Sequence, residues 1–415
     1  MFINSGLLSA ILLFVFIRTL NAQNYNWTKM SDMVYKCAGF SACEIDGKIY
    51  AVGGTNGTLH NGQYGETYLQ IYDIQQNKWS LGPLMKYPRM SPGVVVSNGK
   101  IYSIGGGWSF YLSKKIEVYD PVLKTWTEKT ERPKSGSIFG ICAVGSKIYT
   151  FGGESGDGKF PGFIYDIETD SWSDMAEIKI PTGGLAYAYK DGKIYAFGGV
   201  SYNSTIKTVQ VYDIATDKWE IKTDMPLQRF GAVAAVKDGK IYIFGGAVFP
   251  ENIAKKDIQI YDIETDSWTI DTQFQLPLAT QWPAIASCSS SGDIYLMGGE
   301  DRCMMTYTNA VLLKTVYKLE LETSKSEEII DSDNQILYPN PAVNYLQINI
   351  DKAIYNGAII AEISDMKGNI LISEIIDSNN TMSGVRIDID TLSPGIYNLV
   401  LSSDDKIQTV RFVKQ

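Results

Sequence analysis

The sequence predicts an all-β chain in which one structural unit is repeated six times. Each unit contains an apolar strand that ends in a Gly-Gly pair, and these pairs begin at Gly53, Gly105, Gly152, Gly198, Gly245 and Gly298. In five units a strand ending in Tyr-Asp follows, with a Trp six residues after the Asp. The Gly-Gly pairs are 46 to 53 residues apart. A period near fifty residues with several short strands per unit is typical of a β-propeller, so we expect six blades.

Four short strands fit each unit. In residues 93–106 two apolar strands flank Asn98-Gly99, a two-residue signal for a β-hairpin. A third strand, IEVYD, is expected to pair with a fourth strand that carries Trp126. Four short strands cannot bury both of their faces alone, so the units must stack, with the recurring Tyr and Trp side chains between them. The unit resembles a kelch repeat, which implies a ring of four-stranded antiparallel blades.

The sixth unit predicts how the ring closes. It lacks the Trp that follows the Tyr-Asp strand elsewhere, whereas Trp27 precedes the first unit, 52 residues before Trp79. We therefore expect the strand around Trp27 to be the outer strand of blade six. Such closure removes the free edge of the ring.

The first residues predict export from the cytoplasm. Residues 7–17 form an apolar run of eleven residues, which is too short for a bilayer span of about twenty. A small residue, Ala22, lies before a plausible cleavage point, so residues 1–22 are predicted to be a secretory signal peptide, although no Lys or Arg precedes the apolar run. No later segment is apolar enough to predict a transmembrane span.

Charge and histidine content exclude several classes of function. The formal net charge is −9 and the chain has no basic run, which argues against nucleic acid or anionic lipid as a partner. The single His, His60, argues against a metal site built on several His ligands. The sequence predicts no metal and no cofactor.

The end of the chain has a different character. Residues 326–336 are polar and predict a linker between a propeller over residues 23–325 and a small β-sandwich over residues 337–415. The sandwich begins with YPNP at Tyr338, has a D-x-x-G turn at Asp365, and continues through LSPGIY to a basic final strand, VRFVKQ. It resembles the type A sorting domain of the type IX secretion system of Gram-negative bacteria, an Ig-like β-sandwich. The resemblance implies contact with that secretion machinery, export across the outer membrane, removal of the tail, and release or surface attachment.

The repeat serves as its own control for functional residues, because a feature present in every blade is scaffold. Twelve residues before the recurring Ile, where each innermost strand begins, the six units have Cys37, Arg89, Gly136, Thr182, Arg229 and Trp282. Directly after Gly-Gly, blades three and six carry Glu154 and Glu300. We expect these positions and Trp108 to lie on one face of the propeller, where two Arg and two Glu could grip a carboxylated or polyhydroxylated ligand. The alternative is that each Arg forms a salt bridge with a neighbouring acid and holds the loops.

The cysteines follow the same comparison. Cys43, Cys142 and Cys288 lie six residues before the recurring Ile, at what we expect to be a small apolar core site, and are predicted to be buried free thiols. Cys37 and Cys303 lie on the expected loop face of the two blades that meet at ring closure. A disulfide between them is a hypothesis.

Three functions fit these patterns. The first is a secreted or surface-attached, non-enzymatic module that binds a glycan or a protein. The alternative is an enzyme resembling the bacterial kelch mutarotases, N-acetylneuraminate epimerase among them. In that case Glu154 or Glu300 would act as general acid/base, while Arg89 and Arg229 held the sugar carboxylate. The third is a structural role in the surface layer.

Overall fold

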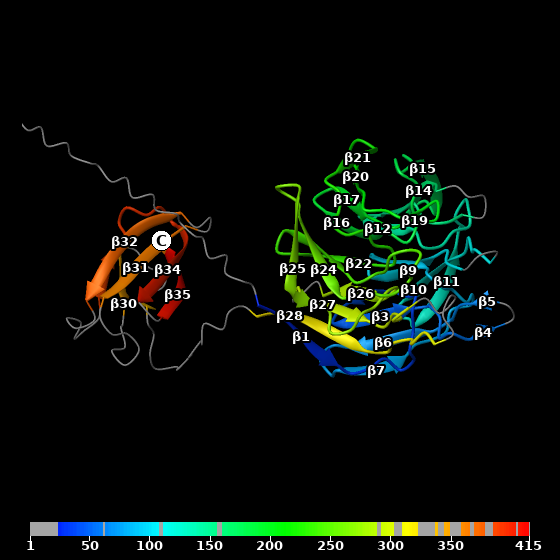
Figure 1. Cartoon of the computed structure of the whole chain (residues 1–415), viewed down its shortest axis with the longest axis horizontal. Coiled ribbons are helices and arrows are strands. Elements are labelled where there is room, and N and C mark those ends of the chain that lie inside the picture. The colour runs from blue at the N-terminus through cyan, green and yellow to red at the C-terminus, as the bar shows by residue number, and fades with distance from the viewer. Residues whose placement is uncertain are drawn as a thin grey trace, which may run out of the picture. The chain divides into compact units, whose positions relative to one another are not determined.

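A computed structural model describes the chain over residues 24–60, 63–107, 111–155, 160–288, 292–302, 309–322, 337–338, 344–348, 358–365, 369–377, 385–403 and 406–414. The chain forms two compact units, one of which is Tyr25–Leu321 while the other contains Glu322–Gln415 (Figure 1). The predicted signal peptide and the predicted linker lie outside the described residues. Within the described residues, no helix has the length and hydropathy needed to cross a membrane.

The first unit consists of six four-stranded sheets. Blade one contains β2 (Ser41–Ile45), β3 (Lys48–Val52), β6 (Leu69–Asp73) and β7 (Lys78–Leu81). Blade two contains β8 (Gly93–Ser97), β9 (Lys100–Ile104), β10 (Ile116–Asp120) and β11 (Thr125–Lys129). Blade three contains β12 (Gly140–Val144), β13 (Lys147–Phe151), β14 (Gly162–Asp166) and β15 (Ser171–Met175). Blade four contains β16 (Ala186–Lys190), β17 (Lys193–Phe197), β20 (Val209–Asp213) and β21 (Lys218–Lys222). Blade five contains β22 (Val233–Lys237), β23 (Lys240–Phe244), β24 (Asp257–Asp262) and β25 (Ser267–Gln275). Blade six contains β26 (Ala284–Ser287), β27 (Ile294–Met297), β28 (Val316–Glu322) and β1 (Asn24–Met30). Short hairpins β4 (Leu59–His60)–β5 (Gln63–Tyr64) and β18 (Val200–Ser201)–β19 (Ser204–Thr205) extend the loops of blades one and four.

The innermost strands contact one another in a closed order, β2 with β8, then β12, β16, β22, β26 and again β2. The predicted six-bladed propeller is therefore confirmed. The predicted closure is confirmed as well, because β1 is hydrogen-bonded to β28 as the outer strand of blade six. Figure 1 shows this pairing of the blue and yellow ends of the propeller.

Aromatic pairs fill the space between the blades, as expected. In five blades the Tyr of Tyr-Asp is buried and its ring lies 5.0–5.2 Å from the ring of the following Trp. The indole Nε1–H of each Trp donates to a backbone carbonyl of the preceding connection, for example from Trp219 to Ala176 at 2.9 Å. In this way one Trp links two blades by packing and by a hydrogen bond.

Trp219→Ala is expected to lower the free energy of unfolding by about 3–5 kcal/mol, because Trp219 is 5% exposed and packs in the core shared by blades three and four. Trp126 occupies the equivalent position in blade two but is only half-buried. Trp126→Ala should therefore have a smaller effect in the same chemical denaturation experiment. Equal losses in the two variants would contradict the importance of burial at this position.

Blade six departs from the repeat in the connection between β26 and β27. Ala286 pairs with Tyr295 in blade six, whereas Cys43 pairs with Tyr50 and Cys142 with Tyr149. The connection in blade six is thus two residues longer. The expected equivalence of Cys288 with Cys43 and Cys142 is therefore wrong, because Ala286 occupies that site. Cys142 is a buried free thiol, as predicted, and Cys288 is buried as well, whereas Cys43 is a free thiol that is only half-buried.

The second unit is a β-sandwich. A three-stranded sheet contains β29 (Leu337–Tyr338), β30 (Tyr345–Ile348) and β33 (Val385–Asp388), and a four-stranded sheet contains β31 (Ala358–Ser364), β32 (Ile370–Asp377), β34 (Gly395–Ser403) and β35 (Lys406–Lys414). Apolar side chains of both sheets meet in one core, including Leu346 of β30, Ile363 of β31 and Leu399 of β34. In the LSPGIY segment, the Tyr397 hydroxyl donates to the Ser393 carbonyl at 2.7 Å and fixes the entry into β34.

Candidate functional site

The loops that lead into the innermost strands lie at one end of the propeller, called here the loop face. In every blade the second Gly of Gly-Gly donates its backbone N–H to a carbonyl of the next blade at 2.7–2.9 Å. The accepting residues form a ring: Cys37, Arg89, Gly136, Thr182, Arg229 and Thr280. The two Gly have φ between +58° and +98°, and a Cβ on Gly54 would lie 2.9 Å from the Ala38 carbonyl oxygen. This close approach is why the repeat needs Gly at these positions.

The expectation that Trp282 belongs to this ring is wrong. Thr280 takes the position in blade six, and its Oγ1 donates to the Gly298 carbonyl at 3.1 Å, as Thr182 Oγ1 does to the Gly198 carbonyl at 3.1 Å. The connection after β26 is two residues longer than in the other blades. Counting back twelve residues from the recurring Ile therefore reached Trp282 instead of Thr280.

Trp282 belongs instead to a second ring, two residues further along each blade. Its members are Gly39, Ser91, Ile138, Gly184, Gly231 and Trp282, all with φ between +49° and +63°. Backbone hydrogen bonds of 2.6–3.0 Å connect five of the six neighbouring pairs. A left-handed backbone is easy for Gly but costs about 1–2 kcal/mol for a bulky or β-branched residue. Ile138 and Trp282 therefore hold strained backbone where three other blades have Gly.

Five members of this second ring, all except Gly231, line one end of a central cavity of about 270 Å³, and this end is called here the mouth. Residues from all six innermost strands line the cavity. The Trp282 indole lies over two glycines of the ring, because a Cβ on Gly184 or Gly231 would lie 2.8 or 3.0 Å from its ring atoms. Its edge also meets the Phe230 ring, with centroids 5.8 Å apart. Trp282 thus covers the mouth on the side of blades four and five.

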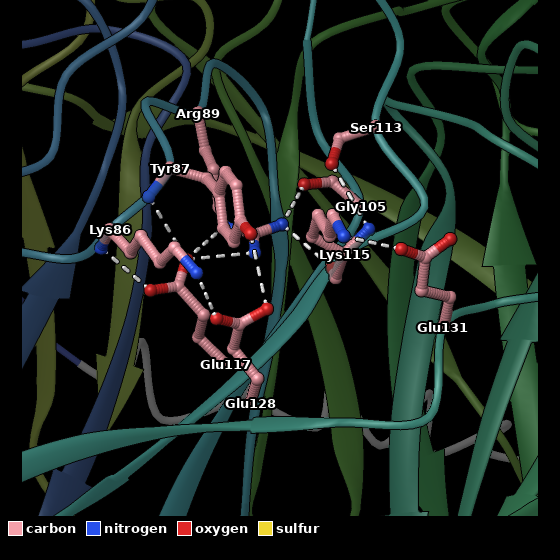
Figure 2. A network of polar contacts seen from close by, with 9 residues as sticks. All are labelled: Lys86, Tyr87, Arg89, Gly105, Ser113, Lys115, Glu117, Glu128 and Glu131. Atoms are coloured by element: carbon pink, nitrogen blue, oxygen red, sulfur yellow. Dashed lines mark hydrogen bonds and ion pairs between the residues drawn. The ribbon is translucent and has the colours of Figure 1, made fainter.

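Arg89 lies away from this cavity, in the interior of blade two (Figure 2). Its side chain is 0% exposed and forms an ion pair with Glu117 of β10, with Nη2 2.9 Å from Oε2. Nη1 donates to the carbonyls of Lys115, at 2.8 Å, and of Gly105. Burial lowers the pKa of Arg89, and the charge of Glu117 opposes that shift. Around this pair Figure 2 also shows exposed contacts of Lys86 and Tyr87 with Glu128.

Comparison of the blades explains why a charged pair lies here. At the position of Glu117, blades one, four and five have Gln70, Gln210 and Gln259, each of which accepts a hydrogen bond from the backbone of the preceding connection at 2.8–2.9 Å. Glu117 Oε1 makes the same contact with Lys86 N at 2.7 Å. Because a carboxylate is charged, its burial requires a partner, which Arg89 provides.

Arg229 is 5% exposed and pairs with Asp257 of β24. Its Nη1 donates to the Gln228 carbonyl at 2.7 Å, while Nε has no hydrogen-bond partner within the described part of the chain. Both arginines therefore show the salt-bridged arrangement that the sequence left as an alternative.

The two predicted acids lie at equivalent positions on opposite blades. Glu154 is backbone-paired with Ser137, and Glu300 with Gln281, which places both beside the ring of accepting carbonyls. Their environments differ, because Glu300 is 3% exposed whereas the Glu154 side chain is exposed. Glu154 forms no ion pair within the described residues, and partial desolvation raises its pKa.

Two predicted site residues, Trp108 and Cys303, lie outside the described residues. Cys37 is buried, with Sγ 3.4 Å from the Gly53 carbonyl oxygen, and the hypothesis of a disulfide with Cys303 stays a prediction. Among the described residues, no group of His, Cys, Asp or Glu has an arrangement suited to a metal ion.

Sequence reasoning missed the residues that line the cavity below the loop face, chiefly Tyr187. At the same position of the innermost strand the other blades have Ala42, Val94, Ile141, Ala234 and Ile285. The repeat comparison could have found this departure if it had been extended from the loops into the strands.

Comparisons with known proteins agree with both units. Residues 138–343 match a family model described as the KLHDC2/KLHL20/DRC7 Kelch-repeats domain, residues 36–86 and 88–132 match the Kelch motif, and residues 336–415 match the secretion system C-terminal sorting domain.

Several curated kelch proteins are similar to part of this chain. Kelch-like protein 15 of Danio rerio is 30% identical over 206 residues, which is 43% of this chain and 32% of the relative. Kelch repeat and BTB domain-containing protein 1 of Vaccinia virus (strain Copenhagen) is 24% identical over 196 residues, 46% of this chain and 34% of the relative. Alpha-scruin of Limulus polyphemus is 28% identical over 193 residues, 42% of this chain and 20% of the relative. The chain spans about a third of the length of the first two relatives. With the repeat, the closed ring and these matches together, the chain belongs to the kelch-repeat β-propeller proteins and carries a type A sorting domain of the type IX secretion system.

Proposed function

We propose that the propeller is a non-enzymatic binding module whose loop face recognises a protein outside the cell. The sorting domain implies secretion or surface localisation through the type IX system. A predicted signal peptide over residues 1–22 would supply the first step of that route. The exported part is a rigid ring whose variable loops are the natural place for a ligand.

Exposed aromatic side chains on the loops of blades three to five carry this proposal. Tyr202 is 79% exposed at the tip of the β18–β19 hairpin, where Tyr202 and Asn203 both have positive φ, at 45° and 64°. The Phe160 ring meets Tyr202 edge-on at 6.5 Å. Phe249, 39% exposed, donates its backbone N–H to Thr205 Oγ1 at 2.7 Å, so the loops of blades four and five are tied together. We call Phe160, Tyr202 and Phe249 the aromatic surface.

The aromatic surface favours a protein over a sugar. Exposed Tyr and Phe on short hairpins contribute large contact area with little loss of side-chain entropy, which is typical of the residues that dominate protein interfaces. Ile253, 44% exposed in the neighbouring blade-five loop, adds apolar area. A sugar site built on Arg89 and Arg229 lacks support, because both guanidinium groups are buried and paired.

The enzymatic alternative, a sugar mutarotase or epimerase, has weaker support. It needs an Arg that faces the substrate carboxylate together with a general acid/base. Glu154 has the exposure and the raised pKa that suit the second role. Neither Arg89 nor Arg229 is a candidate for binding the substrate carboxylate, because both guanidinium groups are buried and paired with acids.

The test compares three forms of the full-length protein in capture of surface proteins and on a glycan array. The double variant Tyr202→Ala/Phe249→Ala is expected to lose the captured protein, with affinity lowered at least tenfold. Tyr189→Ala is the matched control, because Tyr189 is 39% exposed in the same blade near the β16–β17 turn, at the opposite end of the innermost strand. Binding of a glycan that the double variant loses would show a sugar ligand instead. Binding that the double variant retains would overturn the role of the aromatic surface.

A further inference from the structure

The central cavity has features that the loop-face proposal does not use. Its walls are formed mainly by aliphatic side chains of the six innermost strands, with Phe40, Phe139 and Trp282 toward the mouth. Four lining residues carry a polar side-chain atom: Ser41, Ser91, Tyr187 and Trp282. Of these, Ser41 Oγ already donates to the Pro92 carbonyl at 2.7 Å. The other three have no side-chain hydrogen bond within the described residues.

Tyr187 is the polar group that lies deepest in the strand region. Its ring packs edge-on against Phe151 of blade three at 6.0 Å. Burial raises the pKa of the Tyr187 hydroxyl. The hydroxyl oxygen is not one of the fully buried polar atoms that lack a hydrogen-bond partner. Tyr187 is half-buried and lines the cavity. A Tyr hydroxyl inside a protein normally has a hydrogen-bond partner.

The mouth of the cavity is also specialised. Trp282 and Ile138 keep a left-handed backbone at positions where Gly39, Gly184 and Gly231 have no side chain. This asymmetry puts an indole across the part of the mouth beside Gly184 and Gly231. Strained residues of this kind are concentrated at functional sites.

We propose that the central cavity is a second binding site, which takes a small flat aromatic molecule with one hydrogen-bonding group. The size follows from the volume. A cavity of about 150 Å³ binds benzene, so 270 Å³ has room for about ten heavy atoms. The aromatic residues at the mouth favour a flat ring, and Tyr187 pairs with the polar group of the ligand.

Indole and indene form a matched pair of probes, because they have nearly the same shape and only indole carries an N–H. Calorimetric titration of the full-length protein is expected to show indole binding with a dissociation constant below about 1 mM. Tyr187→Phe should weaken indole roughly threefold to tenfold, the usual range for one hydrogen bond, and should leave indene within twofold. Absence of indole binding to the unaltered protein would overturn the proposal, and equal weakening of both probes would remove Tyr187 from it.

A second variant tests the cavity without relying on a hydrogen bond. Ala234 lines the cavity, so Ala234→Leu fills part of it and should abolish binding of both probes. Ala215→Leu, in the exposed turn between β20 and β21 of blade four, makes the same change outside the cavity and should leave binding unchanged. Thermal unfolding of each variant shows that it is folded. Binding that persists in Ala234→Leu would place the probes elsewhere and overturn the proposal.

Discussion

A chain that lacks residues 24–30 is expected to unfold at markedly lower temperature across the whole propeller, not only at blade six. These residues form β1, and their removal exposes the edge of β28 and opens the ring. Trp27 of β1 stacks on Phe274 of blade five at 6.1 Å and meets Phe244 at 5.9 Å. Loss of the Trp27 side chain should lower the free energy of unfolding by about 3 kcal/mol, a large part of the roughly 5–15 kcal/mol that a domain has.

Differential scanning calorimetry of the deleted chain and of Trp27→Ala measures both effects. The deletion should shift the main transition by more than the point variant does, because it also removes the backbone pairing with β28. In the control, the seven residues of β1 are inserted after Glu322, preceded by a short turn. The transplanted strand can then pair with β28 from the C-terminal end of the propeller. Recovery of the transition would show that the strand itself closes the ring. An unchanged transition in the deleted chain would contradict closure by β1.

The repeat explains how far the sequence could predict this structure. Gly-Gly pairs identify the blades because backbone atoms lie too close for a Cβ at either position, from the next blade at the first Gly and from the same blade at the second, so the spacing of the pairs reports geometry directly. Trp27 predicted closure for a similar reason, since it completes a pattern that blade six lacks. Counting along the chain failed for Trp282, because two additional residues between β26 and β27 shift the register of blade six.

Side-chain partners were harder to predict than blades. Arg89 and Glu117 are 28 residues apart, and only the fold shows that both side chains point into the same blade interior. The comparison of Glu117 with Gln70, Gln210 and Gln259 carries the missing signal, because a charge replaces an amide at one buried position. The same is true of Tyr187, whose hydroxyl replaces an aliphatic side chain. Single-blade departures inside strands thus deserve the same weight as those in loops.

Arg89→Met is expected to lower the free energy of unfolding by about 3–5 kcal/mol, the cost of leaving one partner of a buried pair without the other. The side chains of Arg89 and Glu117 are 0% and 1% exposed, so water cannot replace the lost partner. Lys86→Met is the control from the same network. Its ion pair with Glu128 is exposed, and its loss should cost less than about 1 kcal/mol.

The decisive variant is Arg89→Met/Glu117→Gln, which gives blade two the neutral amide that blades one, four and five already use. Glutamine can keep the contact with Lys86 N and carries no charge that needs Arg89. The double variant should therefore be more stable than Arg89→Met and than Glu117→Gln, although the carbonyls of Lys115 and Gly105 lose their donor. Urea denaturation of the four proteins gives the coupling energy between the two residues. Additive losses would show that Arg89 does not compensate the charge of Glu117. In that case the main partners of Arg89 would be the carbonyls of Lys115 and Gly105 and not the Glu117 carboxylate.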